Sequence, residues 1–134
     1  MRRIRLNSLL ILVLLTISLS STPKPVAASS ISAYELINWV NNLRTGTYGL
    51  PALYEDAIID SSAQWTAETM AANGVCAHLS SQGYPGVRDR LVSFGYGGGQ
   101  TVWATENMAC GNSLTIETIS GYWADADHMR PVVD

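Results

Sequence analysis

The segment on which the fold depends is IIDSSAQWTAETMA, residues 58–71. Its apolar and small side chains recur at intervals of three and four residues, which places them on one face of a helix. Asn73 and Gly74 follow directly, and a glycine after the last helical residue is a common helix end. Because several side chains on this face are small, we expect another element to approach it closely.

A second helix is predicted before this segment, over residues 32–45. Ser32 and Glu35 have the spacing of a capping box, in which each side chain accepts a hydrogen bond from the other residue's backbone amide. Apolar residues then recur at helical spacing, and Gly46 marks the expected end of the helix.

The chain after the central segment is interrupted by glycines between residues 83 and 99. A short helix is predicted over 87–94, and the glycines at 97–99 lack the Gly-Lys-Ser/Thr sequence that a phosphate-binding loop needs. Residues 101–105 read TVWAT and predict a strand, because β-branched and aromatic residues favour extended structure. A last helix is expected to begin near Ser113 or Thr115 and to continue to Trp123.

The N-terminus has the features of a secretory signal peptide. Three arginines precede an apolar run at residues 9–19, which is shorter than the roughly 20 residues that span a membrane. Small residues at Val26-Ala27-Ala28 place the predicted cleavage after Ala28. We expect a secreted or periplasmic protein with residues 29–134 as its single domain and no membrane span after cleavage, the alternative being an uncleaved anchor.

The predicted mature chain is acidic. It has no lysine, and its four arginines stand against eleven carboxylates, which gives a net charge of −7. Such a surface repels phosphate backbones and anionic lipid headgroups, so nucleic acid is not an expected partner.

Cys76 and Cys110 are the only cysteines. An even number of cysteines in an exported chain favours a disulfide, and two buried free thiols are the alternative. No C-x-x-C motif is present, which argues against thioredoxin-like redox chemistry.

His78 and His128 are the only histidines, and each lies near the end of a predicted helix among polar residues. Imidazole binds metals and transfers protons near neutral pH, although an isolated histidine is more often an ordinary surface residue. No H-E-x-x-H or G-x-S-x-G motif is present, so residue patterns alone name no reaction. Arg88 and Arg90 are expected on an exposed helix, and Trp103 and Trp123 in the core.

Several segments together resemble the CAP superfamily of secreted proteins, also called SCP domains, in its bacterial form. They are Leu36 to Arg44, Leu53 to Ala71, Cys76-Ala77-His78-Leu79-Ser80, Gly83 to Tyr96, Glu106-Asn107-Met108-Ala109 and Trp123 to His128. Their order is more specific than any one of them. The resemblance implies an α/β fold, an α-β-α layered sandwich. Because that fold continues past the last histidine, the resemblance implies that the chain is truncated at Asp134 and that the last strands of the sheet are missing.

The resemblance also implies a cleft in which two histidines and two carboxylates hold a divalent metal, usually zinc. Carried over to this chain, the metal ligands are His78, Glu106 and His128. Ala126 stands where the family has a glutamate, so either Asp125 or Asp127 replaces it or the fourth position is empty. Imidazole and carboxylate ligands suit four-coordinate zinc. The competing interpretation is structural, with Glu106 anchoring its own segment.

Three functions are compatible with this cleft. The first is a binding module without turnover, which holds a small apolar or lipid-like ligand or an extracellular protein. The second is an extracellular hydrolase that uses a zinc-bound water or a His/Glu pair to cleave peptide or cell-wall bonds. The third is a purely structural or interaction domain.

Overall fold

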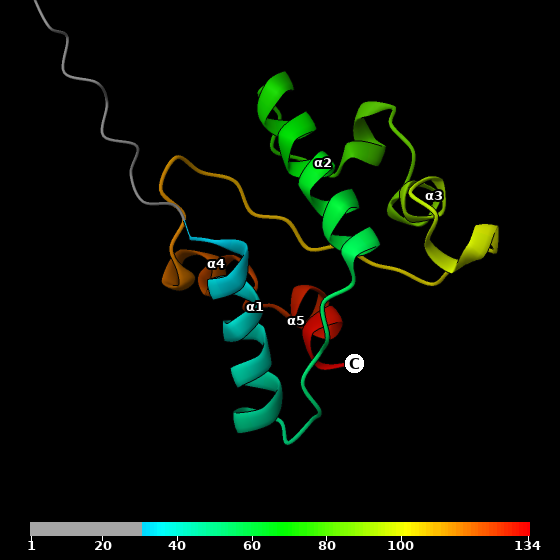
Figure 1. Cartoon of the computed structure of the whole chain (residues 1–134). Helices are drawn as coiled ribbons and strands as arrows, with labels where there is room; N and C mark the ends of the chain where they lie inside the picture. Colours follow the sequence, from blue (N-terminus) through cyan, green and yellow to red (C-terminus); the bar gives the residue numbers. More distant parts are fainter. Residues whose placement is uncertain (1–30) are drawn as a thin grey trace, which may run out of the picture.

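The computed structural model describes residues 31–134, and the predicted signal peptide lies outside them. The described part contains five α-helices and short 3₁₀ and π turns (Figure 1). The helices are α1 (Ala33–Asn42), α2 (Ala57–Asn73), α3 (Val87–Ser93), α4 (Ile116–Tyr122) and α5 (Ala126–Val133).

The predicted α/β sandwich is wrong, because residues 31–134 contain no β-strand. Residues 101–111 form an extended segment in which no backbone group hydrogen-bonds to another within the described chain. A strand needs a partner strand for its amides and carbonyls, and the five helices offer none. The β-favouring residues 101–105 therefore give extended backbone without a sheet.

Side chains anchor this extended segment in place of a sheet. Arg88 Nε donates to the Ala104 carbonyl at 3.3 Å, and Trp123 Nε1 donates to the Met108 carbonyl at 3.0 Å. The Arg88 guanidinium also lies 4.1 Å from the centre of the Trp103 ring. Trp103 itself is 80% exposed, so its predicted place in the core is wrong, whereas Trp123 is buried as expected.

The capping box of α1 is confirmed. The backbone N–H of Ser32 donates to Glu35 Oε2 at 2.8 Å, and the N–H of Glu35 donates to Ser32 Oγ at 3.2 Å. The end of the helix differs from the expectation, because α1 stops at Asn42 and continues as a π turn over Leu43–Thr47. Gly46 lies inside this turn rather than ending the helix.

The bounds of α2 agree with the sequence pattern. Asp56 caps its start, with Oδ1 accepting from the amides of Ile58 at 2.9 Å and Ile59 at 3.2 Å. Gly74 ends it in the left-handed conformation at φ 61°, which glycine adopts without steric cost. The short helix predicted over 87–94 is confirmed as α3, and the helix expected to begin near Ser113 or Thr115 is confirmed as α4, capped by Thr115. It is not the last helix, because α5 follows it and was not predicted from the sequence.

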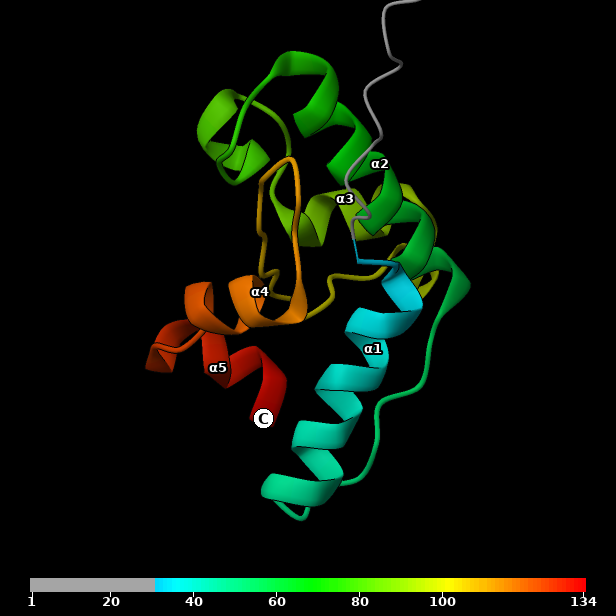
Figure 2. The same ribbon diagram turned by 90° about the vertical axis from the view of Figure 1, so that its left-hand side faces the viewer.

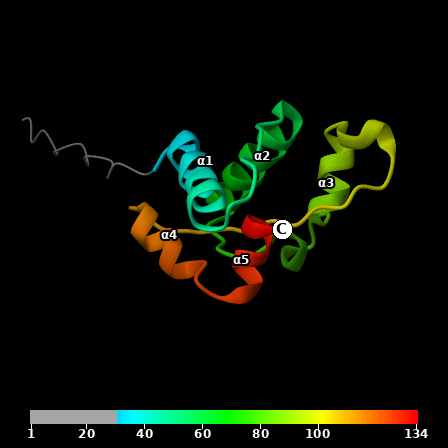
Figure 3. The ribbon, with the colours of Figure 1, turned by 90° about the horizontal axis from the view of Figure 1, so that it is seen from below.

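The helices form two small groups (Figures 1 and 3). In one group α1 packs with α4 and α5: the rings of Trp39 and Trp123 are 6.0 Å apart, and Arg44 NH1 donates to the Val132 carbonyl at 2.7 Å. In the other group α2 packs with α3, where the rings of Trp65 and Phe94 are 6.3 Å apart. The extended segment runs between the groups, as Figure 2 also shows.

The predicted disulfide is confirmed. Cys76 and Cys110 are bonded, with their Cα atoms 5.8 Å apart and a separation of 34 positions in the sequence. The bond ties the chain after α2 to the far end of the extended segment, so it holds His78 and Glu106 in the same region. Within the described residues, every helix is too short or too polar to cross a bilayer.

Candidate functional site

His78 lies in the turn after α2, directly before a 3₁₀ turn over Leu79–Gln82. Leu79 is fully buried and fixes the backbone next to the histidine. The His78 side chain is 45% exposed, and its Nδ1 lies 3.1 Å from Glu106 Oε1. This hydrogen bond joins two of the four predicted metal ligands.

Glu106 lies on the extended segment, and its second oxygen is bound by an arginine. Arg90 of α3 donates from NH2 to Glu106 Oε2, and from NH1 to the Pro85 carbonyl at 2.8 Å. Arg90 is only 2% exposed, so the prediction that it lies at the surface is wrong. Its Nε has no hydrogen-bond partner among the described residues. Arg90, Glu106 and His78 therefore form a continuous hydrogen-bonded chain from the interior to the surface.

Asp125 and His128 form a second pair at the start of α5. Asp125 is the N-cap: its Oδ1 accepts from the amides of Asp127 and His128, each at 3.0 Å. Its Oδ2 lies 2.7 Å from His128 Nδ1. The hydrogen bond from the His128 amide, followed by the one from its side chain, lowers the pKa of Asp125 below its ordinary value. Of the two aspartates considered from the sequence, Asp125 is the one beside the histidine.

Asn107 connects the two pairs. Its Nδ2 donates to the His128 carbonyl at 2.6 Å, and Asn107 directly follows Glu106 in the chain. The Glu-Asn sequence thus binds one histidine through its carboxylate and holds the backbone of the other through its amide.

The four predicted ligands are brought together as two pairs and not as one tetrad. Among residues 31–134, no group of three or more histidine, cysteine, aspartate or glutamate side chains is placed to hold a metal ion. Both carboxylates are already engaged by protein donors, Glu106 by His78 and Arg90, and Asp125 by α5. As placed, these carboxylates orient the histidines rather than act as ligands themselves.

The remaining atoms that could bind a metal are the Nε2 atoms of His78 and His128. Each carboxylate accepts from Nδ1, so a neutral imidazole carries its proton there and leaves a lone pair on Nε2. Histidine ligands of metals are commonly fixed in this way by a carboxylate on the other ring nitrogen. Each histidine is thus held singly in the way that metal-binding histidines are held, and the two pairs do not form the four-ligand set expected from the sequence.

A shallow pocket of about 390 Å³ lies beside His78. It is formed by the 3₁₀ turn, the start of α3 and the extended segment, and its lining consists of His78, Ser80, Gly86, Val87, Arg88, Ala104, Thr105 and Glu106. The pocket has both signs of charge on its wall. A polar ligand of small size can therefore contact the imidazole of His78 there.

Comparison with known proteins finds no matching family model, no similar curated protein and no similar solved structure. The resemblance to the CAP superfamily therefore stays a prediction.

Sequence reasoning missed Arg90, which is the residue that holds Glu106. Arg88 and Arg90 are two positions apart on a short helix, and no pattern in the sequence distinguishes them. Only the packing of α3 shows that Arg90 lies in the interior while Arg88 stacks on Trp103.

Proposed function

We propose that the chain is an exported binding module of the CAP type that takes up a divalent metal, zinc, through Nε2 of His78 and His128. The observation that carries the proposal is that both imidazoles are held at Nδ1 by a carboxylate, at 3.1 and 2.7 Å. Neutral imidazole nitrogen is a good ligand for zinc. Export is supported by the signal-peptide pattern of residues 1–28.

Each residue around the histidines has a separate task in this proposal. Glu106 and Asp125 keep the proton on Nδ1 and fix the ring planes, and Arg90 fixes Glu106. Asn107 holds the backbone of His128 next to Glu106. A bound zinc supplies a positive centre at which an anionic or polar group of a ligand can bind.

The proposal is tested by calorimetric titration of zinc into the metal-free secreted product, whose mass shows whether the chain begins at Ser29. We expect one zinc per chain, and loss of binding in both His78→Ala and His128→Ala. Glu106→Ala should weaken zinc binding about 10-fold to 100-fold, the usual effect of removing a carboxylate that orients a ligand. Glu106→Gln should weaken it less, because the amide oxygen still accepts from Nδ1.

The matched control is Glu68→Gln, which removes an exposed carboxylate of α2 that bonds only to Gln64 in the described chain. Zinc binding should not change in this variant. A wild-type protein that binds no zinc, or histidine variants that bind it as tightly as the wild type, would contradict the proposal.

A hydrolase is the second candidate, and one observation favours it. The chain Arg90–Glu106–His78 ends at the pocket of about 390 Å³ and leaves His78 Nε2 as a base at its wall. A carboxylate that holds the far side of an imidazole is the usual support of a histidine general base. Turnover of peptide or cell-wall substrates that is lost in His78→Ala and kept in His128→Ala would favour this candidate over the binding module.

A further inference from the structure

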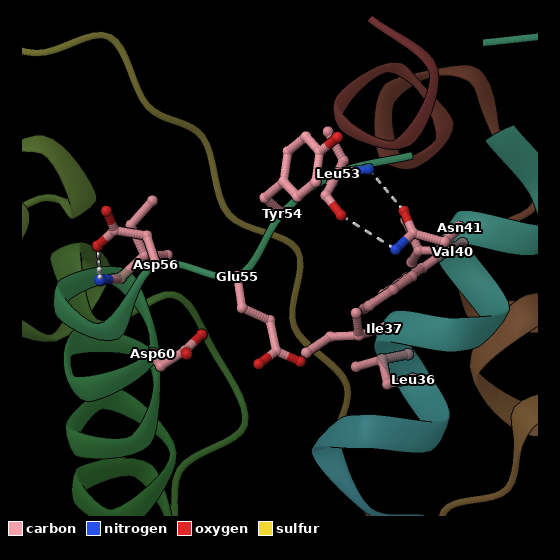
Figure 4. Close-up of a pocket in the computed structure, with 11 residues that line it drawn as sticks. Leu36, Ile37, Val40, Asn41, Leu53, Tyr54, Glu55, Asp56 and Asp60 are labelled. Carbon is pink, nitrogen blue, oxygen red and sulfur yellow. Dashed lines mark hydrogen bonds between the residues drawn. The ribbon is translucent and has the colours of Figure 1, made fainter. Parts of the chain in front are cut away.

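A second hollow, of about 250 Å³, lies between α1 and the start of α2 (Figure 4). We call it the α1–α2 groove. Its apolar wall is formed by Leu36, Ile37 and Val40 of α1, by Ile59 of α2 and by the buried Trp123. Asn41 holds the segment between the helices in place, because its side chain donates to the Leu53 carbonyl at 3.1 Å and accepts from the Leu53 amide at 2.7 Å.

Three carboxylates stand at the edge of this apolar wall, those of Glu55, Asp56 and Asp60. Asp56 is engaged in capping α2. The side chains of Glu55 and Asp60 take part in no hydrogen bond or ion pair between described residues, and Figure 4 shows both side chains in the space between the two helices. No arginine lines the groove. Its wall is therefore apolar and its rim is negative without a compensating cation.

Tyr54 adds an aromatic ring beside the carboxylates. It lines the groove and is 95% exposed, an unusual exposure for so large a side chain. A tyrosine ring attracts a cation over its face, and quaternary ammonium groups are bound by aromatic rings in this way. The Tyr54 ring and the carboxylates therefore all favour a positively charged ligand.

We propose that the α1–α2 groove binds a small amphiphilic cation, an alkyl chain that carries an ammonium group. The alkyl chain packs on the wall of α1 and Trp123, and the ammonium group lies between Tyr54, Glu55 and Asp60. A fatty acid of the same length meets the same wall but is repelled by the rim and by a mature chain of charge −7. The volume lies just under the usual range for drug-sized ligands, which limits the occupant to a short chain.

This site shares no lining residue with the pocket at His78, so it does not depend on the proposed zinc. A basic amphipathic peptide has related chemistry. The small volume of the groove favours the small amphiphilic cation over a peptide. Binding of such a peptide instead is one of the results that the experiment below can distinguish.

The experiment compares three ten-carbon probes with different head groups below their micelle concentrations: decyltrimethylammonium, decyl glucoside and decanoate. Binding is followed by the indole N–H signal of Trp123 in NMR, since this group has a defined partner in the Met108 carbonyl. Each titration is run with EDTA and with zinc. We expect decyltrimethylammonium to bind tightest and decanoate weakest, in the same order in both conditions.

Two double variants distinguish the effect of the rim carboxylates on binding from the effect of the overall charge of the protein. Glu55→Gln with Asp60→Asn should weaken decyltrimethylammonium on the order of fivefold and leave decyl glucoside unchanged. Glu68→Gln with Asp89→Asn removes the same charge outside the groove and should change neither. Ile59→Ser should weaken all three probes, because it removes apolar wall at a half-exposed position.

The proposal fails if decyltrimethylammonium binds no tighter than decanoate, or if the two double variants weaken it equally. It also fails if Ile59→Ser leaves every probe unaffected, or if a lysine-rich amphipathic peptide shifts the Trp123 signal and decyltrimethylammonium does not. Loss of zinc binding with an intact order of probes would contradict only the proposed metal function.

Discussion

Arg88 and Arg90 lie on the same short helix but have opposite surroundings. Arg88 is exposed and stacks on Trp103, whereas Arg90 is 2% exposed and binds Glu106. A charge that is buried to this extent is stable only with a partner of opposite charge, and the partner depends on it in turn. The position of His78 at the pocket therefore depends on a residue that contacts neither the histidine nor a ligand.

Replacing Arg90 with methionine should lower the free energy of unfolding by about 2 kcal/mol, because it leaves the partly buried Glu106 without its cation. Chemical denaturation measures the loss. The matched control is Arg130→Met, which removes an exposed guanidinium 3.8 Å from Asp127 and should cost less than about 0.5 kcal/mol. Equal losses in the two variants would show that the bond to Glu106 does not stabilise the fold.

At the scale of elements, local hydrogen bonds decide where helices begin. The capping box at Ser32 and Glu35 and the N-caps at Asp56 and Thr115 each satisfy amides that a first helical turn leaves free. The Ser32 amide, and after it the Ser32 hydroxyl, lowers the pKa of Glu35 below its ordinary value.

The start of α1 should therefore respond to acid. Because the folded-state pKa of Glu35 is lowered, its contribution to stability is complete above the ordinary glutamate pKa of about 4.3 and is lost as the pH falls below it. Glu35→Gln keeps the capping hydrogen bonds but does not titrate, so the difference in Tm between wild type and variant should shrink between about pH 5 and pH 3. Glu68→Gln, outside any cap, is the control. An unchanged difference across this range would contradict the role assigned to Glu35.

The same locality explains which elements could be predicted from the sequence. The helix ending at Gly74, the short helix over 87–94 and the helix beginning after Thr115 were correct because each depends on local sequence, whereas α5 was not predicted. The end of α1 was wrong by a few residues, because the π turn accompanies the inward side chain of Arg44 and its bonds to Pro51 and Val132. The strand at 101–105 was wrong because a strand depends on a partner elsewhere in the chain.

At the scale of the whole molecule, the disulfide and the Asn107–His128 bond join segments that are far apart in the sequence. The sequence indicated the disulfide because the chain has only two cysteines. The resemblance also predicted that His78, Glu106, His128 and either Asp125 or Asp127 meet in one cleft. It could not show that these are two pairs with Arg90 behind one of them, because that depends on how α3 and α5 pack on the extended segment.

The disulfide should supply a large share of the stability. Closing a loop of 34 residues stabilises the folded chain by about 3–4 kcal/mol, compared with about 5–15 kcal/mol for a whole domain. The protein should therefore unfold at a much lower urea concentration when reduced. The Cys76→Ser, Cys110→Ser double variant should show the same low midpoint with and without reductant. A wild-type midpoint that does not respond to reductant would contradict this.

The extended segment at residues 101–111 has a further consequence. Backbone amides without hydrogen-bonded partners exchange with solvent quickly and fit readily into the active site of a protease. Cys110 lies at the far end of the segment, and its partner Cys76 lies before the segment in the chain. A single cut between residues 100 and 109 therefore separates the chain into two pieces that stay covalently joined, and the two histidines then belong to different polypeptides of one molecule.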